Sequence, residues 1–183
     1  MSQGQTGLVL RVPEAEPVVG RWRRQYDPVT AFGVPAHITV LFPWLPIDEV
    51  TADDRAALLG ICAGAAPLQI TFARLGRFPR TLWLEPEPAG PITHLTEAVS
   101  QHWPAYPPYG GEFDESIPHL TVADQQDPDA LRDVVSALES ALPFHAAVDE
   151  LSLLVLRDGR WTLDSVFRLG VSLGRGELCS AAE

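Results

Sequence analysis

The chain has 183 residues, of which 46% are hydrophobic, and a formal net charge of −11. This length fits a single domain with a substantial buried core. The acidity argues against a protein that binds along a nucleic-acid backbone, because such proteins carry a basic face. No apolar run is long enough for a transmembrane helix and the N-terminus lacks the features of a signal peptide, so we expect a cytoplasmic protein. Cys62 and Cys179 form no metal-binding pair, and a structural disulfide between them is not expected.

Hydrophobic periodicity predicts alternating strands and helices along the chain. Strands are predicted at residues 7–13, 36–43, 67–76, 81–86, 117–123, 145–156 and 161–169. Helices are predicted at residues 15–25, 50–64, 90–103 and 127–141. Asp127 and Pro128 are typical of the cap and first turn of the last helix. Turns are expected at 77–80 and at Asp158-Gly159, and loose tails at 1–6 and 174–183.

The two halves of the chain resemble each other at three places in the same order. LVLRVPEAEPVV from Leu8 resembles LWLEPEPAGPIT from Leu82, and PLQITFARL from Pro67 resembles PFHAAVDEL from Pro143. A histidine motif described below repeats between these segments. The sequence therefore predicts an internal duplication of a βαβαβ unit, with repeats at about 7–77 and 81–156 and a final strand at about 161–170.

The repeated histidine motif consists of His37-Ile38-Thr39 and His119-Leu120-Thr121. Each copy sits in an apolar, β-branched run after a proline-marked loop. Alternation along a strand places His and Thr on one face and turns the residues between and after them, including Phe42, toward a core. Two imidazoles and two hydroxyls on one surface could hold a phosphate and move protons on both sides of it.

A third copy of the pattern, His94-Leu95-Thr96, has a different context. Its apolar neighbours recur at helical spacing, and residues two apart on a helix point in nearly opposite directions. Composition alone gives roughly 0.3 such tripeptides by chance, so an unrelated copy is unsurprising. We expect His94 to be a surface or half-buried helical residue.

Several other residues have two interpretations. Arg77 and Arg80, and Arg157 and Arg160, occupy matched turns and could line a groove or be solvated. Tyr106, Tyr109 and Phe113 precede the second motif and could stack on a base or ribose or simply pack their loop. Residues expected to be structural or on the surface are Phe42 and Trp44 (core or lobe interface), His102 and His145 (surface), and Arg21, Arg23 and Arg24 (C-terminal end of a helix).

AHITVLF from Ala36 and PHLTVA from Pro118 together resemble the two signatures of the 2H phosphoesterase superfamily. PPYGGEFDESIPHLTVA from Pro107 is similar to the second motif and loop of its 2′-5′ RNA ligase-like (cyclic phosphodiesterase) branch. The resemblance spans roughly Leu8 to Gly170. It implies an α+β fold in which two duplicated βαβαβ units, related by a pseudo-two-fold axis, form two lobes around a central groove. The sheets would be mainly antiparallel.

The resemblance also implies a function. His37 and His119 would be the catalytic acid and base, and Thr39 and Thr121 would bind the substrate phosphate. By family analogy His119 would activate water and His37 would protonate the leaving oxygen, although the symmetric motifs do not fix this. No cofactor or metal is implied. The substrate would be a 2′,3′-cyclic phosphate or a 2′-5′ phosphodiester.

The acidity favours a small nucleotide or an RNA terminus over duplex nucleic acid as the partner. We also expect the protein to be a monomer. Two other functions remain open. One is a non-catalytic module that binds nucleotides or phosphate. The other is a metal-dependent hydrolase, for which the sequence offers no local ligand spacing.

Overall fold

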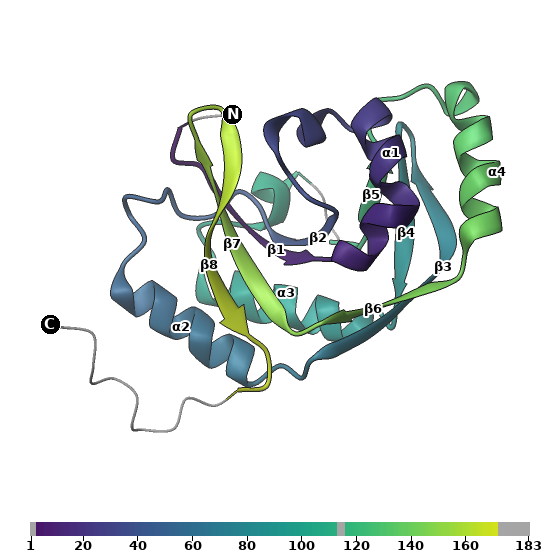
Figure 1. Cartoon of the computed structure of the whole chain (residues 1–183). Helices are drawn as coiled ribbons and strands as arrows, with labels where there is room; N and C mark the ends of the chain where they lie inside the picture. The colour runs from purple at the N-terminus through teal and green to yellow at the C-terminus, as the bar shows by residue number, and fades with distance from the viewer. Residues whose placement is uncertain (1–2, 113–115, 172–183) are drawn as a thin grey trace, which may run out of the picture.

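The computed structural model describes residues 3–112 and 116–171, which contain eight strands and four α-helices (Figure 1). The strands are β1 (Thr6–Arg11), β2 (His37–Leu41), β3 (Leu68–Phe78), β4 (Thr81–Glu87), β5 (Leu120–Ala123), β6 (Phe144–Val148), β7 (Glu150–Arg157) and β8 (Arg160–Arg168). The helices are α1 (Glu16–Tyr26), α2 (Ala52–Ala63), α3 (Gly90–His102) and α4 (Arg132–Ala141). Short 3₁₀ helices lie at Pro13–Ala15, Pro28–Phe32, Pro108–Gly111 and Pro128–Leu131.

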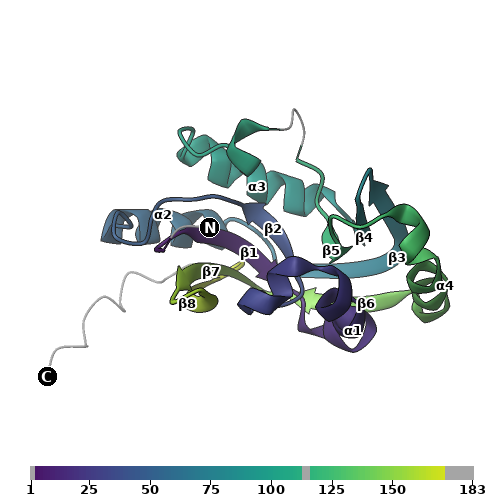
Figure 2. The ribbon, with the colours of Figure 1, turned by 90° about the horizontal axis from the view of Figure 1, so that it is seen from above.

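The eight strands form one curled sheet in the order β6-β3-β4-β5-β2-β1-β7-β8. Every pairing between neighbours is antiparallel, as expected. β2 and β5 meet at the centre through the pair Ile38↔Leu120. Helices α1 and α4 pack against the half that contains β5 and β3, and α3 and α2 pack against the half that contains β2 and β8 (Figures 1 and 2). This symmetric strand order is what a duplicated unit would produce.

The sequence repeats do not coincide with the two halves of the sheet. β3 and β4 form a tight hairpin with Phe78 paired to Thr81, so the last strand of the first repeat lies in the half built mainly by the second. The strand predicted at 145–156 is in fact two strands divided at Asp149. β6 pairs with β3 and β7 pairs with β1, because the chain passes from one half of the sheet to the other at this point.

Several predicted boundaries were wrong by a few residues. Thr6 was assigned to a loose tail, but it is fully buried in β1 and its hydroxyl donates to the Leu45 carbonyl at 2.6 Å. β5 begins at Leu120, three residues later than predicted, and Arg77 belongs to β3 instead of a turn. Asp127 does cap the predicted helix, which begins as a 3₁₀ turn before α4. The tail at 174–183, with Cys179, lies outside the described residues.

Two tryptophans show how the core constrains the sheet. Trp44 is buried as predicted, with its ring edge-on to Trp103 at 5.2 Å. Trp83 lies opposite Gly76 across the β3–β4 ladder, and its indole covers that position. A Cβ built on Gly76 would lie 2.2 Å from the indole. Glycine is therefore required at this position by close contact with the ring.

We predict that Gly76→Ala destabilises the protein by about 1–3 kcal/mol, because the added methyl displaces the Trp83 ring from a packed sheet. Gly60→Ala in α2 is the matched control, since its Cβ would meet open space. That change should stabilise the protein by about 0.5–1 kcal/mol, as alanine replaces a glycine inside a helix. Urea unfolding of both variants gives the comparison, and equal stability of the two would contradict the packing argument.

Candidate active site

Both predicted motifs line a single cavity of about 1110 Å³ at the centre of the sheet. His37 and Thr39 come from β2, Thr121 comes from β5, and His119 lies directly before β5. The cavity is lined further by residues from the elements on both sides: Gly7, Val9, Asp27, Val29, Val34, Phe42, Phe78, Pro79, Arg80, Thr81, Tyr109, Glu112, Ile117, Asp124, Leu154 and Trp161. The structure therefore brings together the four residues at which the sequence analysis expected catalysis and phosphate binding.

Strand alternation orients these four side chains as predicted. Ile38, Val40, Leu120 and Val122 are buried in the core, whereas the His and Thr positions between them are half-buried on the cavity side. The antiparallel pair Ile38↔Leu120 sets His37 opposite Thr121, and Thr39 opposite His119. Each imidazole is therefore neighboured by the hydroxyl of the other motif.

The two imidazoles are held by equivalent hydrogen bonds. His37 Nδ1 lies 2.8 Å from the Pro35 carbonyl oxygen, and His119 Nδ1 lies 2.7 Å from the Ile117 carbonyl oxygen. A carbonyl can only accept, so each Nδ1 carries the proton. This leaves each Nε2 to accept or donate a proton, which is the arrangement that acid–base chemistry requires.

The electrostatic surroundings of the two imidazoles differ. Burial lowers the pKa of His37 to about 4, assisted by the nearby Arg23 guanidinium and by His119. Burial also lowers the pKa of His119, but there the Asp124 carboxylate acts in the opposite direction. The motifs are therefore similar in geometry and unequal in their affinity for a proton.

Arg23 has a structural role that the sequence analysis missed. It lies in the last turn of a helix as predicted, and its side chain, which is 2% exposed, pairs with the equally buried Asp27 at 2.9 Å. Its Nη2 also donates to the Val34 carbonyl at 3.4 Å. Glu16, which lies near Arg23, accepts the Ala36 N–H at 2.7 Å. This network fixes the segment that leads into His37. The sequence Arg21-Trp22-Arg23-Arg24 does not indicate which of its arginines is buried.

The loop before the second motif contributes Tyr109. Its N–H donates to the Phe42 carbonyl at 2.7 Å, and its side chain hydrogen-bonds to Thr39. Burial raises the pKa of the Tyr109 hydroxyl, which therefore stays protonated at neutral pH. Tyr106 instead packs against the main core. Phe113 lies outside the described residues.

One part of the cavity wall is apolar. Phe42 was expected in the core or at the lobe interface; β2 ends at Leu41, and Phe42 lines the cavity, with its ring edge-on to Trp161 at 5.8 Å. Val9 and Leu154 belong to the same small cluster and also line the cavity. The wall offers a surface on which a planar, apolar group could lie.

The turn arginines occupy different environments. Arg80 lines the cavity, and its guanidinium donates to the Gln125 carbonyl at 2.8 Å. Arg77 and Arg157, for which groove lining and solvation were both left open, are not among the lining residues, and Arg157 pairs with Asp164 at 2.9 Å. Arg160 is exposed in β8 and is likewise not among the lining residues. The β3 strand continues through Arg77, so its side chain is not in the turn as supposed.

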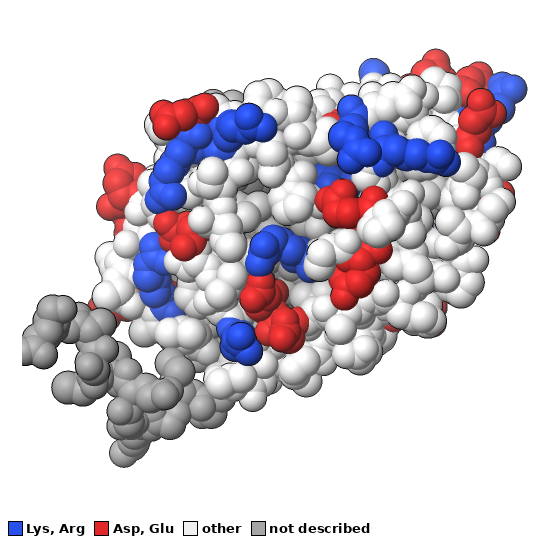
Figure 3. Space-filling model, in the orientation of Figure 1, with Lys and Arg blue, Asp and Glu red and all other residues white. Residues whose placement is uncertain are grey.

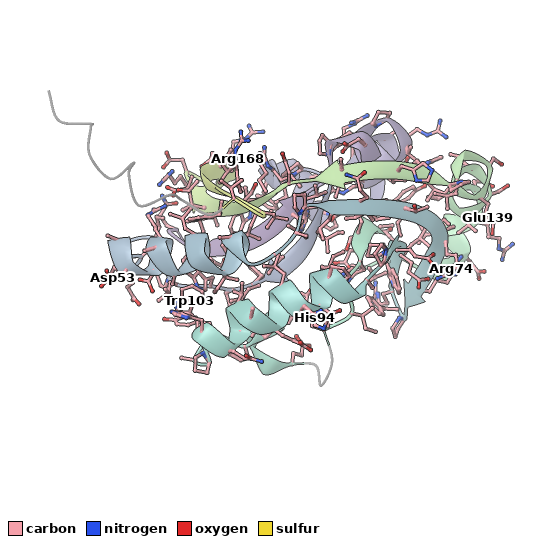
Figure 4. The ribbon with its side chains drawn as sticks, turned by 90° about the horizontal axis from the view of Figure 1, so that it is seen from below. Asp53, Arg74, His94, Trp103, Glu139 and Arg168 are labelled. Carbon is pink, nitrogen blue, oxygen red and sulfur yellow. The ribbon has the colours of Figure 1, made fainter. Side chains whose placement is uncertain are left out.

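The third motif copy lies away from the cavity, as predicted. His94 is exposed on α3, whereas Thr96 is buried on the same helix (Figure 4). His102 and His145 are also exposed. The exposed position of His94 makes it a suitable control for the site.

Charged side chains of both signs are interspersed on the face of the molecule seen in Figure 3. Figure 3 shows arginines in short groups next to acidic residues instead of in a continuous basic stripe. Ion pairs among the described residues include Arg55 with Asp164 at 3.0 Å and Arg74 with Glu85 at 3.0 Å. None of the helices in the described ranges is long and apolar enough to cross a bilayer. Within these ranges, no three His, Cys, Asp or Glu side chains form a set that could hold a metal ion.

Comparisons with known proteins show the family to which the chain belongs. The family profile described as the 2′-5′ RNA ligase superfamily matches residues 11–160. The chain belongs to the 2′-5′ RNA ligase superfamily. It is thus a 2H phosphoesterase, and the family is one of phosphodiesterase-type enzymes.

Solved structures of similar fold include two proteins of this size. E. coli LigT in complex with NADP⁺ has 22% identity and a TM-score of 0.54, with 92% of this chain and 99% of LigT covered. TT0787 of Thermus thermophilus has 21% identity and a TM-score of 0.58, with 91% and 98% covered. No curated protein sequence matches the chain. At these identities the structures establish the superfamily fold.

We predict that the His37 imidazole stays neutral down to about pH 4 in the folded protein. An unfolded histidine has a pKa near 6.5, so between these values the unfolded chain binds a proton that the folded chain does not. Stability should therefore fall as the pH is lowered from about 6.5 to 4. NMR titration of labelled histidines measures the pKa directly. The pH dependence of unfolding should be weaker in His37→Gln, and a His37 pKa near 6.5 would contradict the burial argument.

Proposed function

We propose that this superfamily member is a metal-independent phosphodiesterase that opens 2′,3′-cyclic phosphates, or cleaves 2′-5′ phosphodiesters, of small nucleotides or RNA ends. The observation that carries the proposal is the pair of imidazoles that line one cavity, each with Nδ1 bound to a backbone carbonyl. Two such groups can serve one reaction as base and acid.

The proposed reaction adds water across one P–O bond. One imidazole Nε2 takes a proton from water while the water oxygen attacks phosphorus. The bond from phosphorus to one ribose oxygen breaks, and the other imidazole, in its protonated form, gives its Nε2 proton to that oxygen. The product is a phosphomonoester, and no electrons are gained or lost.

The threonine hydroxyls have a separate role in this proposal. Thr39 and Thr121 line the same cavity as the two imidazoles. Their hydroxyls can donate hydrogen bonds to the non-bridging phosphate oxygens, on which negative charge increases in the transition state. The hydrogen bond between Tyr109 and Thr39 orients one of these hydroxyls.

The size and charge of the cavity support a small substrate. Its volume of about 1110 Å³ is ample for a mononucleotide. Among its described lining residues are three carboxylates, from Asp27, Glu112 and Asp124, and one arginine, Arg80. Such a lining is poorly suited to a polyanionic duplex. The crystal structures of LigT with 3′-AMP and with ATP show that a protein of this fold takes small nucleotides. We further propose that the protein acts as a cytoplasmic monomer.

We predict that His37→Ala and His119→Ala each lower turnover of a 2′,3′-cyclic mononucleotide by about 10²–10⁴-fold, because each removes one proton-transfer group. Thr39→Val should have a smaller effect, mainly on substrate binding. His94→Ala, on the exposed face of α3, should stay within about two-fold of the wild type. The assay is phosphomonoester release from a panel of cyclic nucleotides, with folding of each variant checked by circular dichroism.

Two outcomes would favour the other functions. Tight binding of a cyclic nucleotide by a purified protein that never turns it over would indicate a non-catalytic binding module. Loss of activity in EDTA, with recovery on adding a divalent metal, would indicate a metal-dependent hydrolase. We expect EDTA to leave the rate unchanged.

A further inference from the structure

We propose that the Tyr109 hydroxyl binds the substrate phosphate together with Thr39, as a donor that lies outside both histidine motifs. The inference rests on the proposed phosphodiesterase function and adds a residue to its phosphate-binding set. It differs from the two roles that the sequence left open for Tyr109, which were stacking on a base or ribose and packing of the loop.

The Tyr109 side chain reaches the cavity from the segment between α3 and β5. It lines the same cavity as the two imidazoles and hydrogen-bonds to Thr39. Thr39 is the cross-strand neighbour of His119 in the β2–β5 pairing. A hydroxyl bound to Thr39 therefore lies beside the four motif side chains, where a phosphate held by both motifs would sit.

The backbone of this loop has an unusual conformation at Tyr109. Its φ of 53° and ψ of 30° lie in the left-handed region, which residues other than glycine rarely adopt. Gly110 and Gly111 follow with φ of 65° and 78°, which glycine adopts without strain. The Tyr109 N–H donates to the Phe42 carbonyl at 2.7 Å and so ties the loop to the residue after β2. A strained residue that the surrounding structure holds in place beside a cavity is typical of a functional site.

A pair of hydroxyls is well suited to bind an anion. Each hydroxyl carries one proton, so the hydrogen bond between Tyr109 and Thr39 uses only one of the two protons in the pair. When a phosphate enters, both protons can turn toward its non-bridging oxygens, on which charge increases during the reaction. A phenol is more acidic than an aliphatic alcohol, so Tyr109 is the stronger donor of the two.

Neutral donors are important in this cavity because its lining carries few positive charges. Among the described lining residues, Arg80 is the one arginine, and its guanidinium donates to the Gln125 carbonyl. Thr39, Thr121 and Tyr109 supply side-chain hydroxyls to the same lining. A bound phosphate would therefore depend largely on hydroxyl donors, and the loss of one should be measurable.

The first test is Tyr109→Phe, which removes the hydroxyl and keeps the ring. We expect kcat/KM for a nucleoside 2′,3′-cyclic phosphate to fall by about 10–100-fold, the effect of losing one hydrogen bond to a charged group. Tyr106→Phe is the matched control, since Tyr106 packs against the core and is not among the lining residues. Its activity should match the wild type. Stacking and loop packing need only the ring, so full activity of Tyr109→Phe would overturn the proposal.

A second comparison separates contact with the phosphate from orientation of Thr39. In a Thr39→Val protein, adding Tyr109→Phe should lower kcat/KM by a further factor of about 10, because the phenol hydroxyl contacts the phosphate itself. If Tyr109 acted only through Thr39, the second substitution would cause no further loss. That result would overturn the proposal.

The two diastereomers of a nucleoside 2′,3′-cyclic phosphorothioate provide a readout that a structural defect does not change. Sulfur accepts hydrogen bonds weakly, so the wild type should prefer the diastereomer whose sulfur points away from Tyr109. Tyr109→Phe should reduce this preference, and Tyr106→Phe should retain it. Equal slowing of both diastereomers by Tyr109→Phe would indicate a general structural effect and contradict a contact with one oxygen.

Failure of the proposed function would give a different result. A wild-type protein that hydrolyses none of these substrates would refute the phosphodiesterase function. Calorimetric titration with a nucleoside 3′-monophosphate then decides the role of Tyr109. Binding about 10-fold weaker in Tyr109→Phe, and unchanged in Tyr106→Phe, would support the phosphate contact. Equal affinities, or no binding by the wild type, would overturn it.

Discussion

The antiparallel contact between β2 and β5 is the constraint on which the site depends. The pair Ile38↔Leu120 joins the two halves of the sheet, and both residues are fully buried. Because side chains alternate along a strand, burying these two residues places His and Thr of both motifs on the opposite face. A one-residue slip in either strand would turn that strand's His and Thr into the core, so the hydrophobic core itself specifies the register of the site.

The crossing connections strengthen this central contact. β3 pairs with β4, and β7 pairs with β1, so each half of the sheet contains strands from both sequence repeats. The helices follow the same pattern, since α1 packs against β5 and α3 packs against β2. Separating the two halves would therefore break strand ladders and helix contacts together. A rigid framework of this kind suits a site whose imidazoles must hold a fixed separation.

The two halves of the site are equivalent in backbone and unequal in charge. Each Nδ1 is bound to the carbonyl two residues earlier, so the duplicated motif reproduces its own tautomer. The groups behind the motifs are not duplicated. The Arg23 charge lowers the pKa of His37, whereas the Asp124 carboxylate raises that of His119, whose ring contacts Phe78 and Trp83. A repeated motif gives two identical groups, and acid–base chemistry needs them to differ. The unrepeated neighbours supply that difference.

The sequence by itself determined that His37 lies in a strand, which face the His and Thr residues of both motifs present, and that His94 is excluded from the site, because these follow from local periodicity. It also indicated the family and the α+β class. The tertiary structure alone decided that 145–156 divides between two halves of the sheet, that Phe42 and Arg80 reach the cavity and that Arg77 and Arg157 do not. It also decided that Arg23 is buried against Asp27. These features depend on contacts between residues far apart in the chain, whose pairing leaves no local pattern of spacing or composition.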